Sequence, residues 1–482
     1  MKNIIKILLI NLAILILPSC EGFLDEQPIS EISADTFWKT RDDVRAGIAG
    51  MYDGLQAVVS ARYIDWGDAR SDNFTNGGTG VGSINFALNG LTANMGEANW
   101  DALYRTISRA NLAIDNLPEV AGSDVSDTFR NHNLAQAYAM RAYCHFMGVK
   151  VWGAVPLLLE SVSDRDYRPA RTSAEEVLAS VVTDLNTAVG LINPLEAGIY
   201  EINIGGIYAM LTEAYMWQKE YQKALDSSDK LLEMNRFSLA QTPAEWKLTF
   251  TDPVNSKEAI WSLFWSFTED GSNALASRIG SGTNTSPFIM DPNLLEEWEQ
   301  QEDDFRRYLT YDTLQAVSTG AVQFIWKHFP LASNGEPASS LPPSNQAEVR
   351  NSLYRLSDIL LLRAEAYNKL GDQDLAIGIL NQIKERSGLD PVSMDMFSNQ
   401  EELENAILRE RQVELYAEGK RWFDLRRTGK VITVMDPLLR QRQELRGLNV
   451  VGFGDAGLEL FPISNDALNE NPNLEQNSPY SR

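Results

Sequence analysis

The sequence contains few of the side chains on which most catalytic, redox and metal sites depend. Of its 482 residues, two are cysteine and three are histidine. The histidines, His132, His145 and His328, have neither the spacing of a zinc-binding HExxH motif nor that of a catalytic triad. Phosphate-binding loops and GxGxxG motifs do not occur either. We therefore expect no cofactor, nucleotide or bound transition metal, although calcium held by loop carboxylates would leave no motif.

Basic residues are also scarce relative to acidic ones. The chain has 42 lysines and arginines against 66 aspartates and glutamates, a formal net charge of -24. Because binding to a polyanion relies on lysine and arginine to neutralise phosphates, nucleic acid is an improbable partner. The remaining composition, 44% hydrophobic and 22% charged, is ordinary for a globular protein.

Long apolar runs are absent after residue 20, and the one before it is short. Lys2 and Lys6 flank the start of an apolar stretch that ends at Leu17, which is too short to span a membrane and typical of a signal peptide. Leu17 to Cys20 resembles a bacterial lipobox. We predict a lipoprotein signal peptide over residues 1–19, lipidation of Cys20 by acyl chains such as palmitate, and a polar lipidated tether over residues 20–33. The alternative is an ordinary secretory signal with an incidental cysteine.

The second cysteine, Cys144, lies in an apolar segment with helical periodicity. If Cys20 is acylated, Cys144 has no partner for an internal disulfide. We expect it to be a buried, unreactive thiol.

The first half of the chain alternates between helical and polar stretches. Thr40 and Asp43 have the spacing of a capping box, which predicts that a helix begins there. Between Arg62 and Asn99, helical periodicity is weak and glycine, asparagine and aspartate are frequent, so we expect loops with room for a short strand. Helical periodicity returns over residues 100–117, 134–151 and 173–192.

Two later segments share a spacing typical of tetratricopeptide repeats. Tyr215 precedes Ala224 by nine residues, and Tyr367 precedes Ala376 by nine. Small residues at such positions let two antiparallel helices approach closely while the aromatic ring fills the gap. A degenerate third copy surrounds Ala142. Because the copies are not adjacent, we predict an interrupted helical scaffold rather than a regular solenoid.

Residues 237–350 interrupt this scaffold. Strand-like runs at Ala259–Phe267 and Ala321–His328 are separated by turn-forming clusters such as GSGTNTSP and LPPSN. A late short strand is expected over Leu458–Ile463. The predicted fold class is therefore mainly α, with tetratricopeptide-like helix pairs that form a scaffold and an inserted, loop-rich mixed α/β half.

Residues 398–429 carry the densest structural signal. Ser398 and Glu401 predict a capping box, and Glu410 and Glu414 fall on the apolar stripe of the helix that follows. A carboxylate on such a stripe is costly unless it is paired, and nearby arginines could supply guanidinium groups. The available arginines are Arg409, Arg411, Arg421, Arg426 and Arg427. We interpret the segment as a buried ionic hub that fixes how the last helices dock, with members Glu410, Arg411, Glu414, Arg421 and Arg426.

Three blocks of sequence together resemble the SusD/RagB family of outer-membrane nutrient-binding lipoproteins. They are CEGFLDEQP followed by GMYDGL near the start, YRLSDILLLRAEAYNKLGD, and RERQVELYAEGKRWFDLRRTGK within the predicted hub. The resemblance implies four tetratricopeptide-type helix pairs with a variable half laid across them, in one domain over residues 34–482. The boundaries it suggests are a helical scaffold at about 34–60, 97–236 and 350–430, and a ligand half at about 60–97 and 237–350.

The same resemblance implies a function. A protein of this family captures a glycan outside the cell without cleaving it and delivers it to a SusC-like TonB-dependent barrel, while a lipid anchor holds it at the surface of the outer membrane. Within the family, peptide capture is an alternative. A secreted glycoside hydrolase on a helical scaffold is a second alternative, because it needs only two suitably spaced carboxylates. Candidate carboxylates are Asp65, Asp68, Asp72, Asp303 and Asp304.

Candidate ligand-binding residues come from one polar stretch and two isolated tryptophans. Aromatic faces and hydrogen-bonding side chains are the groups that recognise sugars. The candidates are Trp66, Asp68, Arg70, Asp72, Asn73, Trp265 and Trp326. For Trp66 a core position is equally consistent with the pattern, and for Trp265 and Trp326 the apolar surroundings favour the core.

Overall fold

The computed structural model describes residues 37–78, 80–162, 167–196, 198–279, 286–322, 324–330 and 348–480. The predicted signal peptide, Cys20 and the tether lie outside these residues. Buried apolar side chains form one main cluster that runs from Trp38 to Leu474. Within the described ranges, no helix combines the length and the apolar character needed to cross a membrane.

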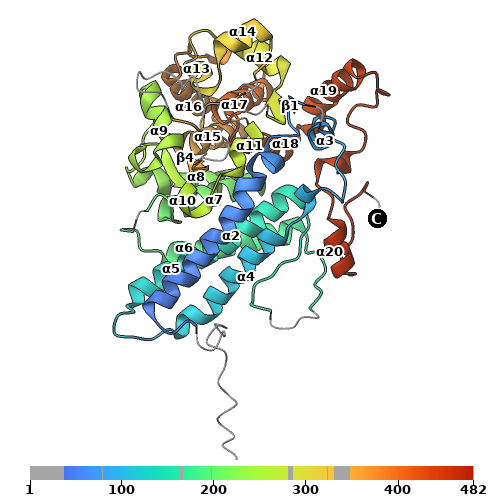
Figure 1. Ribbon diagram of the computed structural model, residues 1–482. Helices are drawn as coiled ribbons and strands as arrows, with labels where there is room; N and C mark the ends of the chain where they lie inside the picture. Colours follow the sequence, from blue (N-terminus) through green and yellow to red (C-terminus); the bar gives the residue numbers. More distant parts are fainter. Residues whose placement is uncertain are drawn as a thin grey trace, which may run out of the picture.

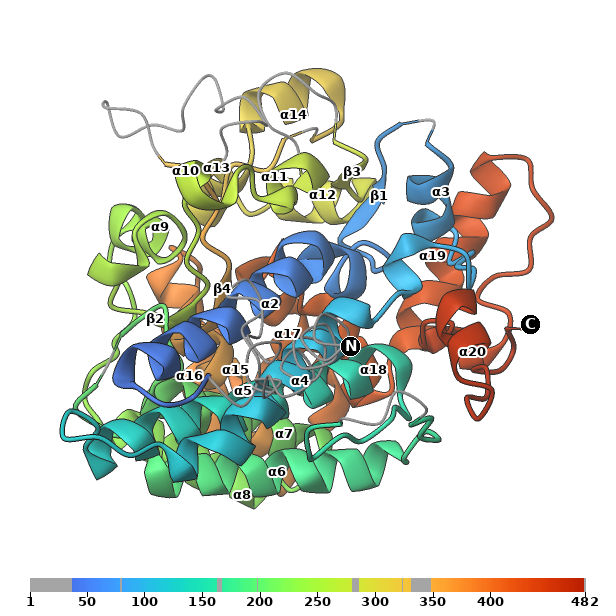
Figure 2. The same ribbon diagram turned by 60° about the horizontal axis from the view of Figure 1, so that its bottom comes forward.

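The first half of the scaffold is a series of long helices, each packed against the next along the chain. These are α2 (Arg41–Gly67), α4 (Asp101–Asn116), α5 (Asp127–Trp152), α6 (Ala174–Leu191), α7 (Ile204–Trp217) and α8 (Tyr221–Glu233). The predicted capping box at Thr40 is present, and so is one at Ser173. Figures 1 and 2 show α2 between the other helices of this series and the inserted half of the molecule.

The two helix pairs predicted from the alanine and tyrosine spacing are confirmed. α7 packs against α8, and α15 (Leu356–Leu370) packs against α16 (Gln373–Arg386). The small residues lie at the contacts, since the side chains of Ala224 and Ala376 are fully buried. α8 also packs against α15, so the two pairs are neighbours although the insertion separates them in sequence. The scaffold is therefore interrupted in the chain but continuous in space.

The insertion consists of short elements. They are α9 (Pro243–Thr251), β2 (Ala259–Ser262), α10 (Phe267–Asp270), α11 (Ala274–Ile279), β3 (Phe288–Met290), α12 (Pro292–Glu299), α13 (Arg306–Thr310), α14 (Thr313–Thr319) and β4 (Ser352–Arg355). Antiparallel pairing of β2 with β4 joins the start of the insertion to its end. β3 pairs antiparallel with β1 (Phe74–Asn76), which follows α2. The β1–β3 pair fixes the insertion to the segment after α2, and the β2–β4 pair closes the insertion where the chain enters α15.

Four further helices complete the chain: α17 (Gln400–Glu414), α18 (Arg421–Thr428), α19 (Val431–Leu445) and α20 (Asn465–Glu470). α17 packs against α15, and α18 contacts both α2 and α19. The cap of α17 differs from the prediction by one residue. Asn399 rather than Ser398 is the N-cap, because its side chain accepts a hydrogen bond from the backbone N–H of Glu402 at 3.0 Å. The carboxylate of Glu402 in turn accepts from the N–H of Ser398 at 2.7 Å.

The end of α2 and the turn after α17 meet backbone to backbone. A Cβ atom added to Gly67 would lie 1.9 Å from the carbonyl oxygen of Gly419. Gly419 itself has φ +67°, and a Cβ there would lie 2.3 Å from the carbonyl oxygen of Tyr63. Glycine is required at both positions, by close approach at Gly67 and by both conformation and space at Gly419.

Three predicted segments differ from the structure. Within residues 62–99 the predicted short strand is present as β1, but two helices were not predicted, because α2 extends to Gly67 and α3 (Val81–Ala87) follows β1. The described residues of 321–328 make only an isolated bridge, from Ile325 to Tyr311. The predicted strand at 458–463 overlaps a 3₁₀ turn at Ala456–Glu459. Short apolar runs are buried in the latter two segments as well, and composition alone does not separate a buried strand from a buried turn or loop.

Candidate ligand-binding groove

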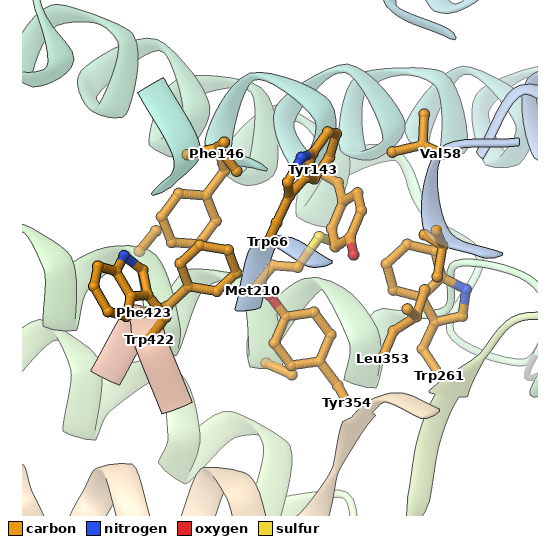
Figure 3. Close-up of a cluster of buried hydrophobic side chains, with 14 of the residues drawn as sticks. Val58, Trp66, Tyr143, Phe146, Met210, Trp261, Leu353, Tyr354, Trp422 and Phe423 are labelled. Carbon is orange, nitrogen blue, oxygen red and sulfur yellow. The ribbon is translucent and has the colours of Figure 1, made fainter. Parts of the chain in front are cut away.

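The polar stretch at the end of α2 faces the interior of the molecule. The ring of Trp66 packs edge-on against Trp152 at a centroid distance of 5.1 Å, and its Nε1–H donates to the carbonyl oxygen of Glu97 at 2.8 Å. Figure 3 shows Trp66 among buried side chains of several helices. Asp68 is fully buried and accepts hydrogen bonds from the backbone N–H groups of Gly419 at 2.7 Å and Arg421 at 3.2 Å. These residues join α2 to the C-terminal helices.

The other candidates in the stretch have similar internal partners. Asn73 donates to Asp68 at 3.0 Å. Arg70 is fully buried with its guanidinium 3.9 Å from the centre of the Trp422 ring, and burial lowers the pKa of Arg70 to about 9. Asp72 makes a two-pronged ion pair with Arg421, with both distances 2.8 Å. In the structure the polar groups of this stretch thus have buried backbone and charged partners, and its contact with a ligand stays a prediction.

The two isolated tryptophans also pack inward. Trp265 is 6% exposed, and its Nε1–H donates to the carbonyl oxygen of Gly271 at 2.8 Å. Trp326 is partly buried against the main core, and its carbonyl oxygen accepts from Lys247 at 2.6 Å. The Trp265 side chain is therefore buried and the Trp326 side chain is partly buried, and their contact with a ligand stays a prediction.

Glu414 lies at the centre of the predicted hub and is fully buried. Its carboxylate contacts the guanidinium groups of Arg306 at 2.7 Å, Arg355 at 2.6 Å and Arg386 at 2.7 Å. Burial acts to raise the pKa of Glu414, but these three arginines hold it well below its usual range. Glu410 shares Arg306 at 2.6 Å. The partners of Glu414 therefore come from α13, β4 and α16, and not from the arginines near it in sequence.

Those nearby arginines serve other acceptors. Arg411 bridges Asp358 and Asp424, both at 2.9 Å. Arg426 is partly buried and donates to the carbonyl oxygen of Lys150 at the end of α5. Together with the Arg421–Asp72 pair, these contacts tie the C-terminal helices to α2, α5 and α15, which is an architectural role.

The carboxylates considered for glycoside hydrolysis are not arranged as an exposed pair. Asp304 is buried and paired with Arg306 at 2.8 Å, and Asp65 is buried against Arg278 at 2.9 Å. Asp68 and Asp72 are engaged as described above. Among the residues that the structure describes, no group of three or more histidine, cysteine, aspartate and glutamate side chains has the geometry of a metal site.

Buried carboxylates near the end of α2 predict a pH dependence of stability. Burial raises the pKa of Asp65 to about 6 and that of Asp68 to about 7. The folded protein therefore holds these protons more tightly than the unfolded chain, whose carboxyls titrate near pH 4. Their contribution to the free energy of unfolding is complete below about pH 4 and is lost as the pH rises through 6 and 7.

A comparison of the wild type with Asp68→Asn isolates the contribution of Asp68 to the pH dependence of stability, because the other titrating groups are common to both proteins. His145 and His328 act in the opposite direction, because burial lowers their pKa values to about 3 and about 4. The urea midpoint of the wild type minus that of Asp68→Asn should decrease between pH 5 and pH 8. A difference that is constant with pH would contradict the raised pKa of Asp68.

An open groove of about 800 Å³ lies between α2, the start of α5 and the chain that follows β2. We name it the Tyr200 groove after the residue at its side. Phe264 is 40% exposed there, and its ring meets that of Tyr200 edge to face at a centroid distance of 5.3 Å. Phe129, with the guanidinium of Arg41 4.3 Å above its ring, adds a third aromatic surface.

Polar side chains hold the walls of the Tyr200 groove in place. Gln56 donates to the carbonyl oxygen of Phe264 at 2.9 Å, which fixes the aromatic segment to α2. Tyr52 donates to Gln136 at 2.6 Å and joins α2 to α5. The exposed carboxylates Glu201 and Glu269 also line the groove. Its volume is typical of small-molecule sites, and it combines apolar ring surface with hydrogen-bonding groups. Such a site can bind a sugar but contains no catalytic arrangement that we recognise among the described residues.

Sequence reasoning missed Tyr200 and Phe264. They lie in separate segments on either side of α7 and α8, and neither belongs to a motif. The signal that could have identified Phe264 was its aromatic side chain in the predicted ligand half that starts near residue 237. Phe264 directly precedes Trp265, which is one of the predicted ligand-binding residues.

Comparisons with known proteins give consistent matches. A family model described as "SusD family" matches residues 337–480, and one described as "Starch-binding associating with outer membrane" matches residues 22–234. SusD-like protein P38 of Formosa agariphila is 32% identical, with 99% of both chains covered. A crystal structure of a SusD superfamily protein from Bacteroides vulgatus has a TM-score of 0.79 at 20% identity and covers 92% of this chain and 100% of that chain. A structure titled "Laminarin binding SusD-like protein" has a TM-score of 0.71 at 22% identity, with 92% and 100% covered.

Proposed function

This chain belongs to the SusD family, and on that basis we propose that it is a cell-surface lipoprotein that binds oligosaccharides or polysaccharides and delivers them to a SusC-like TonB-dependent transporter of the outer membrane. The observation that carries the binding step is the Tyr200 groove, where two aromatic rings meet beside exposed carboxylates. Support for the glycan class comes from the starch-binding description of one matching family and from the laminarin-binding relative of the same fold.

The aromatic rings and the polar groups of the groove contact different surfaces of the sugar. The partly exposed ring of Tyr200 and the exposed ring of Phe264 stack on the C–H surface of a sugar ring, while neighbouring carboxylates accept hydrogen bonds from its hydroxyls. Burial raises the pKa of Tyr200, so its phenol stays protonated and able to donate at physiological pH. Binding at an open groove leaves a polymer chain free to extend beyond it.

Tyr200→Ala is expected to weaken glycan binding about 10-fold, because an aromatic contact contributes roughly 0.5–1.5 kcal/mol beyond its buried area. Affinity electrophoresis in gels that contain starch or laminarin measures the effect. Leu375→Ala is the control, since Leu375 is exposed on α16 and does not line the groove. Equal retardation of Tyr200→Ala and wild type would remove the groove from the proposal.

A reducing-sugar assay and a peptide-binding assay, run beside these gels, separate the alternative functions. Release of reducing sugar from either polysaccharide would indicate a glycoside hydrolase. Absence of retardation by any glycan, with binding to a peptide mixture, would indicate the peptide-capturing alternative.

Delivery across the outer membrane requires a pore, and we propose that the partner transporter supplies it while lipidated Cys20 and its tether hold the binding domain beside that pore. Detergent extraction of outer membranes should therefore co-purify a much larger barrel protein. Cys20→Ala should leave the membrane fraction and lose the palmitate label. Retention of label and membrane location by this variant would contradict the anchor.

A further inference from the structure

A second groove lies at the other side of the helical bundle. It has a volume of about 460 Å³ and is formed by the start of α4, the chain between α5 and α6, and α20. We name it the Tyr167 groove. Three aromatic residues line it: Trp100, Tyr104 and Tyr167. Tyr167 is 47% exposed, so much of its ring surface is in contact with solvent.

The segment that carries Tyr167 is fixed in place from both sides. Arg168 donates to the carbonyl oxygen of Glu470 at 2.6 Å, and Asn471 donates to that of Pro169 at 2.7 Å. Arg171 donates to the carbonyl oxygen of Ala154 at 2.7 Å. These hydrogen bonds secure the segment to α20 and to the end of α5. The exposed ring is therefore held at the surface by a preformed wall, which lowers the entropic cost of binding.

The chemistry of the Tyr167 groove matches that of a sugar site. Tyr104 is oriented by a hydrogen bond from its hydroxyl to the carbonyl oxygen of Pro156 at 2.7 Å, and its ring meets Trp100 edge to face at 5.4 Å. The carboxylate of Asp101 and the side chain of Glu470 line the same groove. An exposed aromatic face beside hydrogen-bonding groups favours a hexose ring over an apolar ligand or a compact ion.

The two grooves lie at opposite ends of α5. Phe129, in the first turn of α5, lines the Tyr200 groove, and Pro156, four residues after Trp152 at the end of α5, lines the Tyr167 groove. The helix has 26 residues, so the grooves are separated by about 39 Å at 1.5 Å per residue. Figures 1 and 2 show α10 and α20, which adjoin the two grooves, on opposite sides of the bundle.

We infer that the Tyr167 groove is a second carbohydrate-binding surface, and that one polysaccharide chain engages it together with the Tyr200 groove. This inference rests on the proposed glycan-binding function. Once one groove holds the polymer, the second binding step becomes intramolecular, which raises the overall affinity without new contacts. A trisaccharide is too short to reach both grooves and binds to each independently.

The test uses the purified lipid-free domain with laminarin and starch as polymers and with laminaritriose and maltotriose as short probes. The wild type should bind two equivalents of the trisaccharide that corresponds to the polymer it retains. Tyr167→Ala should bind one equivalent and should lose at least about 10-fold in affinity for the polymer. Leu375→Ala should match the wild type in both measurements.

The outcomes distinguish a failure of this inference from a failure of the proposed function on which it rests. If Tyr167→Ala keeps two equivalents and the wild-type polymer affinity, the second surface is ruled out while glycan binding stands. If the wild type retains neither polymer, the proposed function and the inference both fail. Thermal unfolding of Tyr167→Ala near the wild-type temperature confirms that a loss of binding is local.

Discussion

Replacing Glu414 with alanine should lower the free energy of unfolding by about 3–5 kcal/mol, the range observed when one partner of a buried ion pair is removed. The carboxylate is fully buried and contacts three guanidinium groups, those of Arg306, Arg355 and Arg386. Its removal leaves excess positive charge in the interior without water to solvate it. Because domains are stable by only about 5–15 kcal/mol, the variant should be near the limit of folding.

Urea unfolding followed by tryptophan fluorescence measures the loss, since the chain has 11 tryptophans. Glu401→Ala is the matched control on the same helix. Its side chain is 73% exposed and makes one ion pair, with Lys430 at 3.1 Å, so its removal should cost less than about 1 kcal/mol. Similar midpoints for the two variants would show that the hub contributes little to stability.

Gly419→Ala should destabilise the protein by about 2–5 kcal/mol, from the positive φ of this residue and the overpacking that a methyl group causes. Gly419 has φ +67°, and its Cβ would lie 2.3 Å from the carbonyl oxygen of Tyr63. The backbone cannot move away easily, because the N–H of Gly419 donates to Asp68 at 2.7 Å. The effect should appear as a lower thermal unfolding temperature.

Replacing a glycine by alanine is expected to raise the free energy of unfolding where the glycine has space around it. Gly378 lies in α16, and an added Cβ would meet no atom within 4 Å. Gly378→Ala should therefore stabilise the protein by about 0.5–1 kcal/mol, because alanine loses less conformational entropy in a helix. Destabilisation by both substitutions, to a similar extent, would argue against the close contact between Gly419 and Tyr63.

Local sequence signals predicted the helical part of the fold well. Thr40 and Ser173 were identifiable as helix caps because a cap depends on residues three positions apart. The α7–α8 and α15–α16 pairs were identifiable because their contacts repeat a spacing within one short segment. The strands were less predictable. β1 pairs with β3, which lies more than 200 residues later, and nothing in either three-residue segment specifies its partner.

The site was harder to predict because polarity indicates a need for hydrogen bonds but not the direction in which they point. Asp68 and Arg70 were predicted to contact a ligand, yet their partners are buried backbone groups and the Trp422 ring. The burial of Glu414 was predictable from its place on an apolar stripe. Its arginine partners were not, since Arg306 lies 108 residues earlier in the chain.

The contact between Asp68 and Gly419 spans 351 residues, and this separation constrains the order of folding. The last turn of α2 is synthesised early, but the backbone N–H groups that satisfy Asp68 belong to residues near the end of the chain. Until those residues arrive, α2 cannot complete its buried end, and Arg306 lacks the carboxylates of α17. Contacts of such long range slow folding, because loop-closure entropy is lost before the contacts stabilise the chain. The nascent protein should therefore remain sensitive to proteases until its final third has emerged and should then become resistant in a single step.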